Sequence, residues 1–251
     1  MSFLSVRALV IASNPHKESD RILRILTKEH GVVLCTASGA ARSGSRFSFG
    51  SQSGILADFT LNSSHDYWYV KEIEVIEPFS QIHEDIRFLT AAAHLLEIAR
   101  DVCFDPESSG EILILLVHAF VAMNSQKKDY RQIVATVEWR LMGILGYPVP
   151  LEPSLYETSG YAIFSFPDCR FYARGKCRIP EGDSCQTLSR SSLKALLHIQ
   201  TSPVEKLFSF TVSEAVLDEI TRLTHRYLCE RLEKKYGKLE MLNHPWNLPE
   251  G

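Results

Sequence analysis

Residues 31 to 47 read GVVLCTASGAARSGSRF, and this stretch indicates both a fold element and a candidate site. Its start, from Val32 to Thr36, has the β-branched character of a strand. The strand leads into a flexible loop of glycine and serine that carries Arg42 and Arg46 and no acid. Small residues let a backbone approach a ligand closely, and each arginine offers five donors in one plane. Because no acid in this stretch pairs with the arginines, we expect an external anion, with phosphate the first candidate.

Four other segments around this stretch also favour strands. Residues 4–13, 55–62 and 67–76 are rich in β-formers, and residues 67–76 alternate with the period of a half-buried sheet. Residues 20–27 fit a strand or a helix, and the KEHG turn that follows favours a hairpin. Five strands within about eighty residues predict a small closed barrel of the OB type.

The pattern becomes helical after Pro78. Apolar residues recur at helical spacing over 82–103, 107–124 and 128–145, and Gly146 and Pro148 end the third segment. Residues 147–188 read as irregular, and helices resume over 189–200 and 213–236. We therefore expect an α+β protein with a five-stranded OB-fold barrel over 1–79. An α-helical domain over 80–251 follows, with an irregular insertion at 147–188.

Composition describes an ordinary globular protein of 251 residues with a net charge of −3. No apolar run reaches about eighteen residues, so we expect no transmembrane helix, and residues 112–123 read as a buried core helix. The start lacks the features of a signal peptide, which favours the cytoplasm. Basic residues gather in patches, with seven Lys or Arg against three acids over 1–50. Residues 51–79 carry one Lys against five acids.

The order of these segments resembles the RecO family of recombination mediators. The resemblance is carried by ALVIAS, ESDRILRILTKEHG, SGAARSGSRF, ILADFTL and IEVIEPF, and then by VEWRLMGILGYPVP in the helical part. It implies an OB-fold and a helical domain that often holds a zinc module. It also implies binding of single- and double-stranded DNA and annealing of complementary strands. Contacts with the single-stranded DNA-binding protein SSB, with RecR and with RecF would help to load RecA on nucleoid DNA, and no reaction would be catalysed.

DNA contact on the barrel is assigned to cationic side chains. We expect Arg42 and Arg46 to contact phosphates, backed by Arg21, Arg24 and Lys28, in a sequence-independent and salt-sensitive way. The alternative for the loop is a solvated, mobile hairpin.

Aromatic side chains of the same domain offer a second kind of contact. Exposed rings on an OB-fold stack on bases, whereas rings in strands more often fill the core. The rings in question are Phe47, Phe49, Tyr67 and Tyr69.

The third predicted helix holds a candidate receptor for the SSB tail. That tail is acidic and ends in an apolar residue, so its receptor needs an apolar pocket with cations at its rim. We assign Arg131, Trp139 and Arg140 to this role. The alternative is a buried tryptophan with two solvated arginines. Basic residues from 222 to 235 offer either a second DNA-facing stripe or an ion-paired, solvated face.

Three of the six cysteines are clustered, and they are the metal candidates. The spacing Cys169-x7-Cys177-x7-Cys185 differs from the paired C-x2-C spacing of a zinc ribbon. The family resemblance would place zinc ligands where this chain has Thr158, Tyr161, Cys177 and Pro180. We therefore expect no zinc and no other cofactor, with aromatic packing in its place, although the three cysteines with His198 are an alternative site. The aromatic residues concerned are Tyr161, Phe164, Phe166, Phe171 and Tyr172.

Motifs of catalysis are missing from the sequence. It contains no P-loop, no H-E-x-x-H and no G-x-S-x-G. We therefore expect a binding protein. Two alternatives stay open: a metal-dependent nucleic-acid enzyme that uses the cysteines of 169–185, and an OB-type scaffold that binds only proteins.

Overall fold

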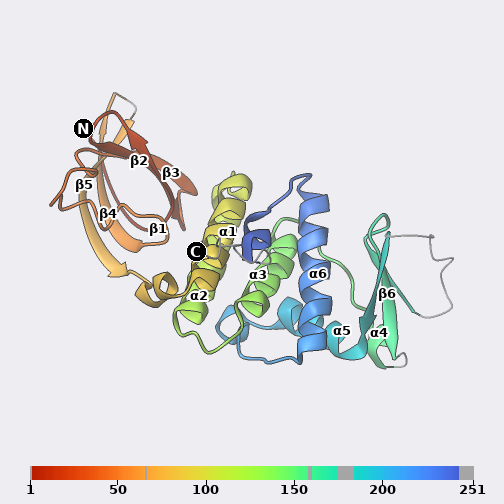
Figure 1. Cartoon of the computed structure of the whole chain (residues 1–251). Coiled ribbons are helices and arrows are strands. Elements are labelled where there is room, and N and C mark those ends of the chain that lie inside the picture. The colour runs from red at the N-terminus through yellow and green to blue at the C-terminus, as the bar shows by residue number, and fades with distance from the viewer. Residues whose placement is uncertain (1, 66, 158–159, 174–183, 243–251) are drawn as a thin grey trace, which may run out of the picture. The chain divides into compact units, whose positions relative to one another are not determined.

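The structure is a computed structural model that describes residues 2–65, 67–157, 160–173 and 184–242. The chain forms two compact units (Figure 1). Unit 1 combines Met1–Gln126 with the returning C-terminal segment Tyr236–Gly251, and unit 2 is Lys127–Lys235.

Unit 1 begins with a closed five-stranded barrel, as predicted. Its strands hydrogen-bond in the order β1-β2-β3-β5-β4, with β4 returning to β1. All pairs are antiparallel except β3 and β5, where Cys35 lies opposite Trp68 in a parallel ladder. Residues 20–27 are therefore a strand. The strands are β1 (Phe3–His16), β2 (Asp20–Thr27), β3 (Val32–Ala37), β4 (Leu56–Ser64) and β5 (Tyr67–Glu77).

The barrel interior is filled by alternate residues of each strand, as the period of a β-strand requires. Leu23 and Ile25 of β2 and Phe59 and Leu61 of β4 are all buried there. Phe47, from the loop between β3 and β4, joins the same core. The loop therefore packs against the barrel.

Two helices and two short 3-10 helices complete unit 1. The elements are η1 (Ser80–Glu84), α1 (Ile86–Val102), α2 (Pro106–Asn124) and η3 (Lys238–Leu242). The side chain of Asp85 caps α1, and that of Asp105 caps α2. Helix α2 lies against β2 so closely that a Cβ at Gly110 would be 2.7 Å from the Lys28 carbonyl oxygen. The first two helices thus pack with the barrel, beyond the predicted domain end at residue 79.

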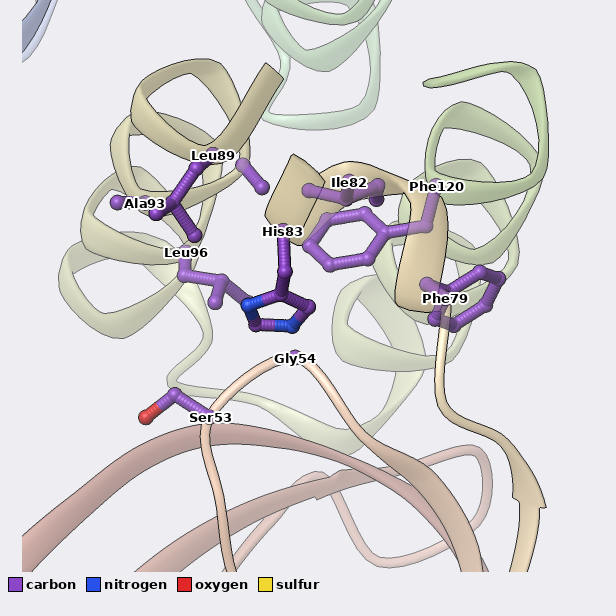
Figure 2. Close-up of a pocket in the computed structure, with 10 residues that line it drawn as sticks. Ser53, Gly54, Phe79, Ile82, His83, Leu89, Ala93, Leu96 and Phe120 are labelled. Carbon is purple, nitrogen blue, oxygen red and sulfur yellow. The ribbon is translucent and has the colours of Figure 1, made fainter. Parts of the chain in front are cut away.

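Helix α2 is long and apolar enough to cross a membrane by length and composition, but half of that segment is buried in the protein. Ile112, Leu116 and Phe120 lie in the core, as expected for a core helix. Beside Phe120, an apolar pocket of about 100 Å³ lies between α1, η1 and the loop at Gly54, with His83 facing that loop (Figure 2).

Unit 2 contains a small sheet where the sequence predicted irregular structure. Strands β6, β7 and β8 pair antiparallel in the order β7-β6-β8. The prediction was wrong because the strands have only four or five residues each, which is too short for alternation to show. Their bounds are β6 (Tyr161–Ser165), β7 (Arg170–Ala173) and β8 (Cys185–Ser189).

The remaining elements of unit 2 are helical. They are α3 (Tyr130–Ile144), α4 (Pro153–Glu157), α5 (Arg190–Thr201), η2 (Val204–Lys206) and α6 (Glu214–Arg231). The rings of Phe166 and Phe171 pack at 5.0 and 4.9 Å from that of Phe164, and Tyr227 of α6 lies 5.6 Å from it. These aromatic residues form the core that joins the sheet to α6.

Candidate nucleic-acid interface

The loop between β3 and β4 is a chain of hydrogen-bonded turns. The Arg42 amide donates to the Gly39 carbonyl, and the Ser45 amide donates to the Arg42 carbonyl. The Ala41 amide also donates to the Ser19 carbonyl at 2.9 Å, which ties the loop to the turn between β1 and β2. Gly39 and Gly44 have φ values of +70° and +73°, a left-handed conformation that glycine adopts without strain. The loop predicted to be flexible is therefore tied in place by its backbone.

Arg42 and Arg46 lie in one shallow, open depression of about 310 Å³ on this loop. Ser38, Ser43 and Ser45 also line it, so hydroxyl donors accompany the guanidinium groups. Both arginines are exposed. The depression thus presents positive charge and hydroxyl groups to solvent, which suits a phosphate.

The two arginines differ in how they are held. Arg46 donates from Nη2 to the Lys71 carbonyl at 3.1 Å, and its guanidinium lies 4.6 Å from the centre of the Phe47 ring. Arg42 makes no side-chain hydrogen bond or ion pair with the described residues. One acid does approach the loop, because Asp20 accepts a hydrogen bond from the Gly39 amide at 2.8 Å. The loop therefore has no acid in its own sequence, but an acid from the start of β2 lies beside it.

The other three predicted cations do not share this depression. Arg21 lies two residues before the buried Leu23, so it is on the same side of β2. Its Nη1 donates to Ser13 Oγ at 3.2 Å, and its Nε is buried. Arg24 is exposed on the outer side of β2, and Lys28 lies just beyond the end of that strand. Of the five predicted cations, Arg42 and Arg46 line the depression, and the other three do not.

The candidate stacking rings differ in how far they are exposed. Phe47 is 7% exposed and belongs to the core, which is the core-filling alternative for this ring. Phe49 and Tyr67 are 53% and 66% exposed, and Tyr69 is half-buried. Phe3, which the sequence did not single out, is exposed and lies 5.0 Å from the Lys71 ammonium. Lys71 is the single Lys of the acidic stretch 51–79, and its backbone also holds Arg46.

Comparison with known proteins supplies the family. A family model described as "Recombination protein O N terminal" matches residues 1–79, and one described as "Recombination protein O C terminal" matches residues 83–240. The chain belongs to the RecO family. A DNA repair protein RecO from Acetivibrio thermocellus is 33% identical over 96% of this chain and 97% of its own length. DNA repair proteins RecO from Thermoanaerobacter sp. (24% identical) and Symbiobacterium thermophilum (23%) match 99% and 97% of the chain, and 100% and 98% of their own lengths.

In unit 2 of this RecO-family chain, the site predicted to bind the SSB tail is not an exposed pocket. Trp139 is 3% exposed and packs against Phe171 and Tyr227, so it corresponds to the buried alternative. Arg131 pairs with Asp129, Glu214 and Asp218. Arg140 donates to the Ile199 and Gln200 carbonyls at the end of α5. Both arginines are thus used to hold unit 2 together, where the alternative had placed them in solvent.

A different surface of unit 2 has the properties that were expected of that receptor. A groove of about 490 Å³ runs between α5 and the start of α6. Lys194 and His198 supply polar groups, and Phe210, Val212 and Val216 supply apolar ones. Ser213, the N-cap of α6, also lines the groove and makes no side-chain capping bond. The positive end of the α6 dipole therefore faces the groove.

Two of the three predicted metal candidates lie in the described part of unit 2. The Cys169 thiol donates to the Phe166 carbonyl at 3.2 Å, and Cys185 is half-buried on β8. Cys177, Thr158 and Pro180 lie outside the described residues. Tyr161, which stands at a ligand position of the family's module, is a strand residue with a phenol where zinc needs a thiolate or an imidazole. The expectation that the chain holds no zinc therefore stays a prediction.

Proposed function

We propose that this protein binds single- and double-stranded DNA through the phosphate backbone and anneals complementary strands without catalysing a reaction on them. The observation that carries the proposal is the depression in which Arg42 and Arg46 face solvent together with three serine hydroxyls. Contacts of guanidinium and hydroxyl groups with phosphate oxygens carry no base information, so we expect this binding to be independent of sequence.

Annealing follows from charge neutralisation. Two DNA strands repel each other through their phosphates, and cationic side chains that bind both strands release counterions and lower that repulsion. Arg24 and Lys28 would serve a second strand, because they are exposed and lie outside the depression. Exposed Phe49 and Tyr67 would stack on unpaired bases at about 1–3 kcal/mol each.

The test is annealing of SSB-coated complementary strands by the wild-type chain and by a variant with Arg42→Ala and Arg46→Ala. We expect the double variant to anneal at least about tenfold more slowly, since each lost phosphate contact weakens binding of both strands. The matched control is Arg7→Ala, which removes an exposed barrel arginine that is already paired with Asp58 at 2.9 Å. Full annealing by the double variant would move the interface elsewhere, and cleavage of the DNA would favour the metal-dependent enzyme.

We further propose that the groove of unit 2 recruits the chain to SSB-coated DNA. An acidic tail with an apolar end complements Lys194, the N-terminus of α6 and the apolar side chains of Phe210 and Val216. Titration with a peptide of the SSB C-terminus tests this, and we expect Lys194→Glu to abolish binding. Arg190→Glu is the matched control, because Arg190 is exposed on the same helix but does not line the groove. Equal loss in both variants would contradict a specific groove.

Cooperation with RecR and RecF in loading RecA, in the cytoplasm at the nucleoid, is part of the same proposal and rests on membership of the family. Its test is RecA assembly on SSB-coated single strands with RecR, in the presence and absence of this chain. We expect faster RecA assembly with the chain present. An OB-type scaffold that binds only proteins would support recruitment to SSB but would not bind bare DNA.

A further inference from the structure

A carboxylate lies in the interior of unit 2. Glu138, on α3, has a fully buried side chain. Its Oε2 accepts a hydrogen bond from Thr224 Oγ1 at 2.9 Å, and its Oε1 lies 2.9 Å from His225 Nδ1. Burying a carboxylate is costly unless hydrogen bonds or a positive charge compensate for the lost water. Glu138 therefore orients His225 with its Nδ1–H toward the carboxylate.

The other nitrogen of the same ring faces a thiol. His225 and Cys229 lie one turn apart on α6, and the distance from His225 Nε2 to Cys229 Sγ is 3.7 Å, within hydrogen-bonding range for sulfur. With Nδ1 committed to Glu138, Nε2 is the atom that can take the thiol proton. Both Cys229 and His225 are half-buried, so part of each residue is open to solvent.

The other described cysteines have different surroundings. Burial raises the pKa of the Cys35 and Cys103 thiols to about 12, which keeps them protonated. Cys169 donates to a backbone carbonyl, and Cys185 has no imidazole partner among the described residues. Within the part of the chain that the structure describes, Cys229 is thus the cysteine that has a histidine and a carboxylate in line with it.

We propose that Cys229 is a thiol-modification site for small electrophiles such as hydrogen peroxide, with His225 as proton acceptor and Glu138 as its positioning residue. Sulfur attacks one peroxide oxygen, an S–O bond forms and the O–O bond breaks. The departing hydroxide takes the proton that His225 received from the thiol, and water leaves. Sulfur is oxidised to sulfenic acid and the peroxide is reduced. This proposal is independent of the proposed DNA binding.

The electrostatics of the ring agree with this geometry. The hydrogen bond with Cys229, and then that with Glu138, raises the pKa of His225 from its ordinary 6.5 to about 10. A proton that passes from the Cys229 thiol to Nε2 therefore stays on the ring at neutral pH, which leaves an imidazolium beside the sulfur. A thiol beside an imidazolium is the arrangement in which cysteines react fastest with electrophiles.

Alkylation of the intact chain with iodoacetamide, followed peptide by peptide, is the test. We expect Cys229 to react about tenfold faster than Cys169 and Cys185, which are also half-buried. The variant His225→Asn should bring Cys229 to the rate of the other two, and Glu138→Gln should lower its rate partly. Unfolding would raise all three rates, whereas loss of the proton acceptor lowers only that of Cys229.

Treatment with hydrogen peroxide and a reagent specific for sulfenic acid completes the test. We expect labelling at Cys229 of the wild-type chain and none at that position in Cys229→Ala. A wild-type Cys229 that is alkylated no faster than Cys185, or peroxide labelling spread equally over Cys169 and Cys185, would overturn the proposal. The pair of His225 and Glu138 would then be a structural contact between α3 and α6 alone.

Discussion

Arg42 and Arg46 share one depression, but they would bind a phosphate at different entropic cost. Arg46 is already oriented by the Lys71 carbonyl and the Phe47 ring, whereas Arg42 has to be ordered by its ligand. The sequence identified both arginines because their neighbours in the chain contain no acid. It did not indicate the roles of Lys71 and Asp20, since both come from other segments of the barrel.

The salt dependence of DNA binding measures how many phosphates these two side chains neutralise. For single strands, the slope of log K against log salt is about −0.7 per phosphate contact. We therefore expect the double variant Arg42→Ala, Arg46→Ala to lose about 1.4 units of slope, and Arg7→Ala to lose none. Fluorescence anisotropy at several salt concentrations provides the measurement. An unchanged slope in the double variant would show that the arginines do not contact phosphate.

The contacts of His225 with Cys229 and then with Glu138 predict a pH dependence of stability. The pKa of His225 is about 10 in the folded chain against 6.5 ordinarily, so folding favours the charged ring. Its stabilising contribution is complete below pH 6.5 and is lost as the pH rises through about 10. In thermal melts, the wild-type chain should therefore exceed His225→Asn most at the acidic end, and the difference should shrink toward pH 10. A difference that grows with pH would contradict the charged pair.

At the scale of elements, the long barrel strands were predictable and the short sheet of unit 2 was not. Strands β1 and β5 have 14 and 11 residues, long enough for a run of β-forming residues to stand out, whereas β7 has four. The aromatic packing around Phe164 was predicted from residue type alone, but the strand register that produces it was not. For Trp139 the sequence left a receptor and a buried ring both open. Residues 132–139 of α3 are all buried, so this segment has no exposed face on which a receptor would sit.

The contact of α2 with β2 rests on the absence of one side chain. Gly110→Ala would place a Cβ 2.7 Å from the Lys28 carbonyl oxygen, so the helix or the strand end has to move. We expect a destabilisation of about 1–3 kcal/mol, typical of overpacking, measured by chemical denaturation. Gly143→Ala in α3 is the matched control, because its Cβ would meet no atom within 4 Å. That change should be neutral or stabilise by up to about 1 kcal/mol. Equal effects of the two substitutions would mean that α2 does not pack this closely.

At the scale of the whole molecule, the predicted domains divide the chain at a single point in the sequence. The two compact units do not, because the C-terminal segment belongs to the same unit as the barrel. Helices α1 and α2 pack in unit 1 together with the barrel. The contacts responsible join distant segments: Gly31 approaches Pro106, and Gly54 approaches Phe120. Local periodicity carries no information about such pairs, so the sequence placed the boundary after residue 79, where the local pattern changes.

The C-terminal segment packs in unit 1. This packing gives a prediction that distinguishes the compact units from the domains predicted from the sequence. Tyr236 is 1% exposed and packs edge-on against His94 of α1, and Lys238 pairs with Glu97 at 3.1 Å. We expect Tyr236→Ala to cost about 3–5 kcal/mol, as for other large aromatic truncations in a core. Because the contact belongs to unit 1, hydrogen exchange should speed up in α1, in α2 and in the strands that they cover. Exchange in α5 and α6 should change less, although these helices are nearer in sequence. If the C-terminal segment belonged to the helical domain as predicted, the opposite pattern would be observed.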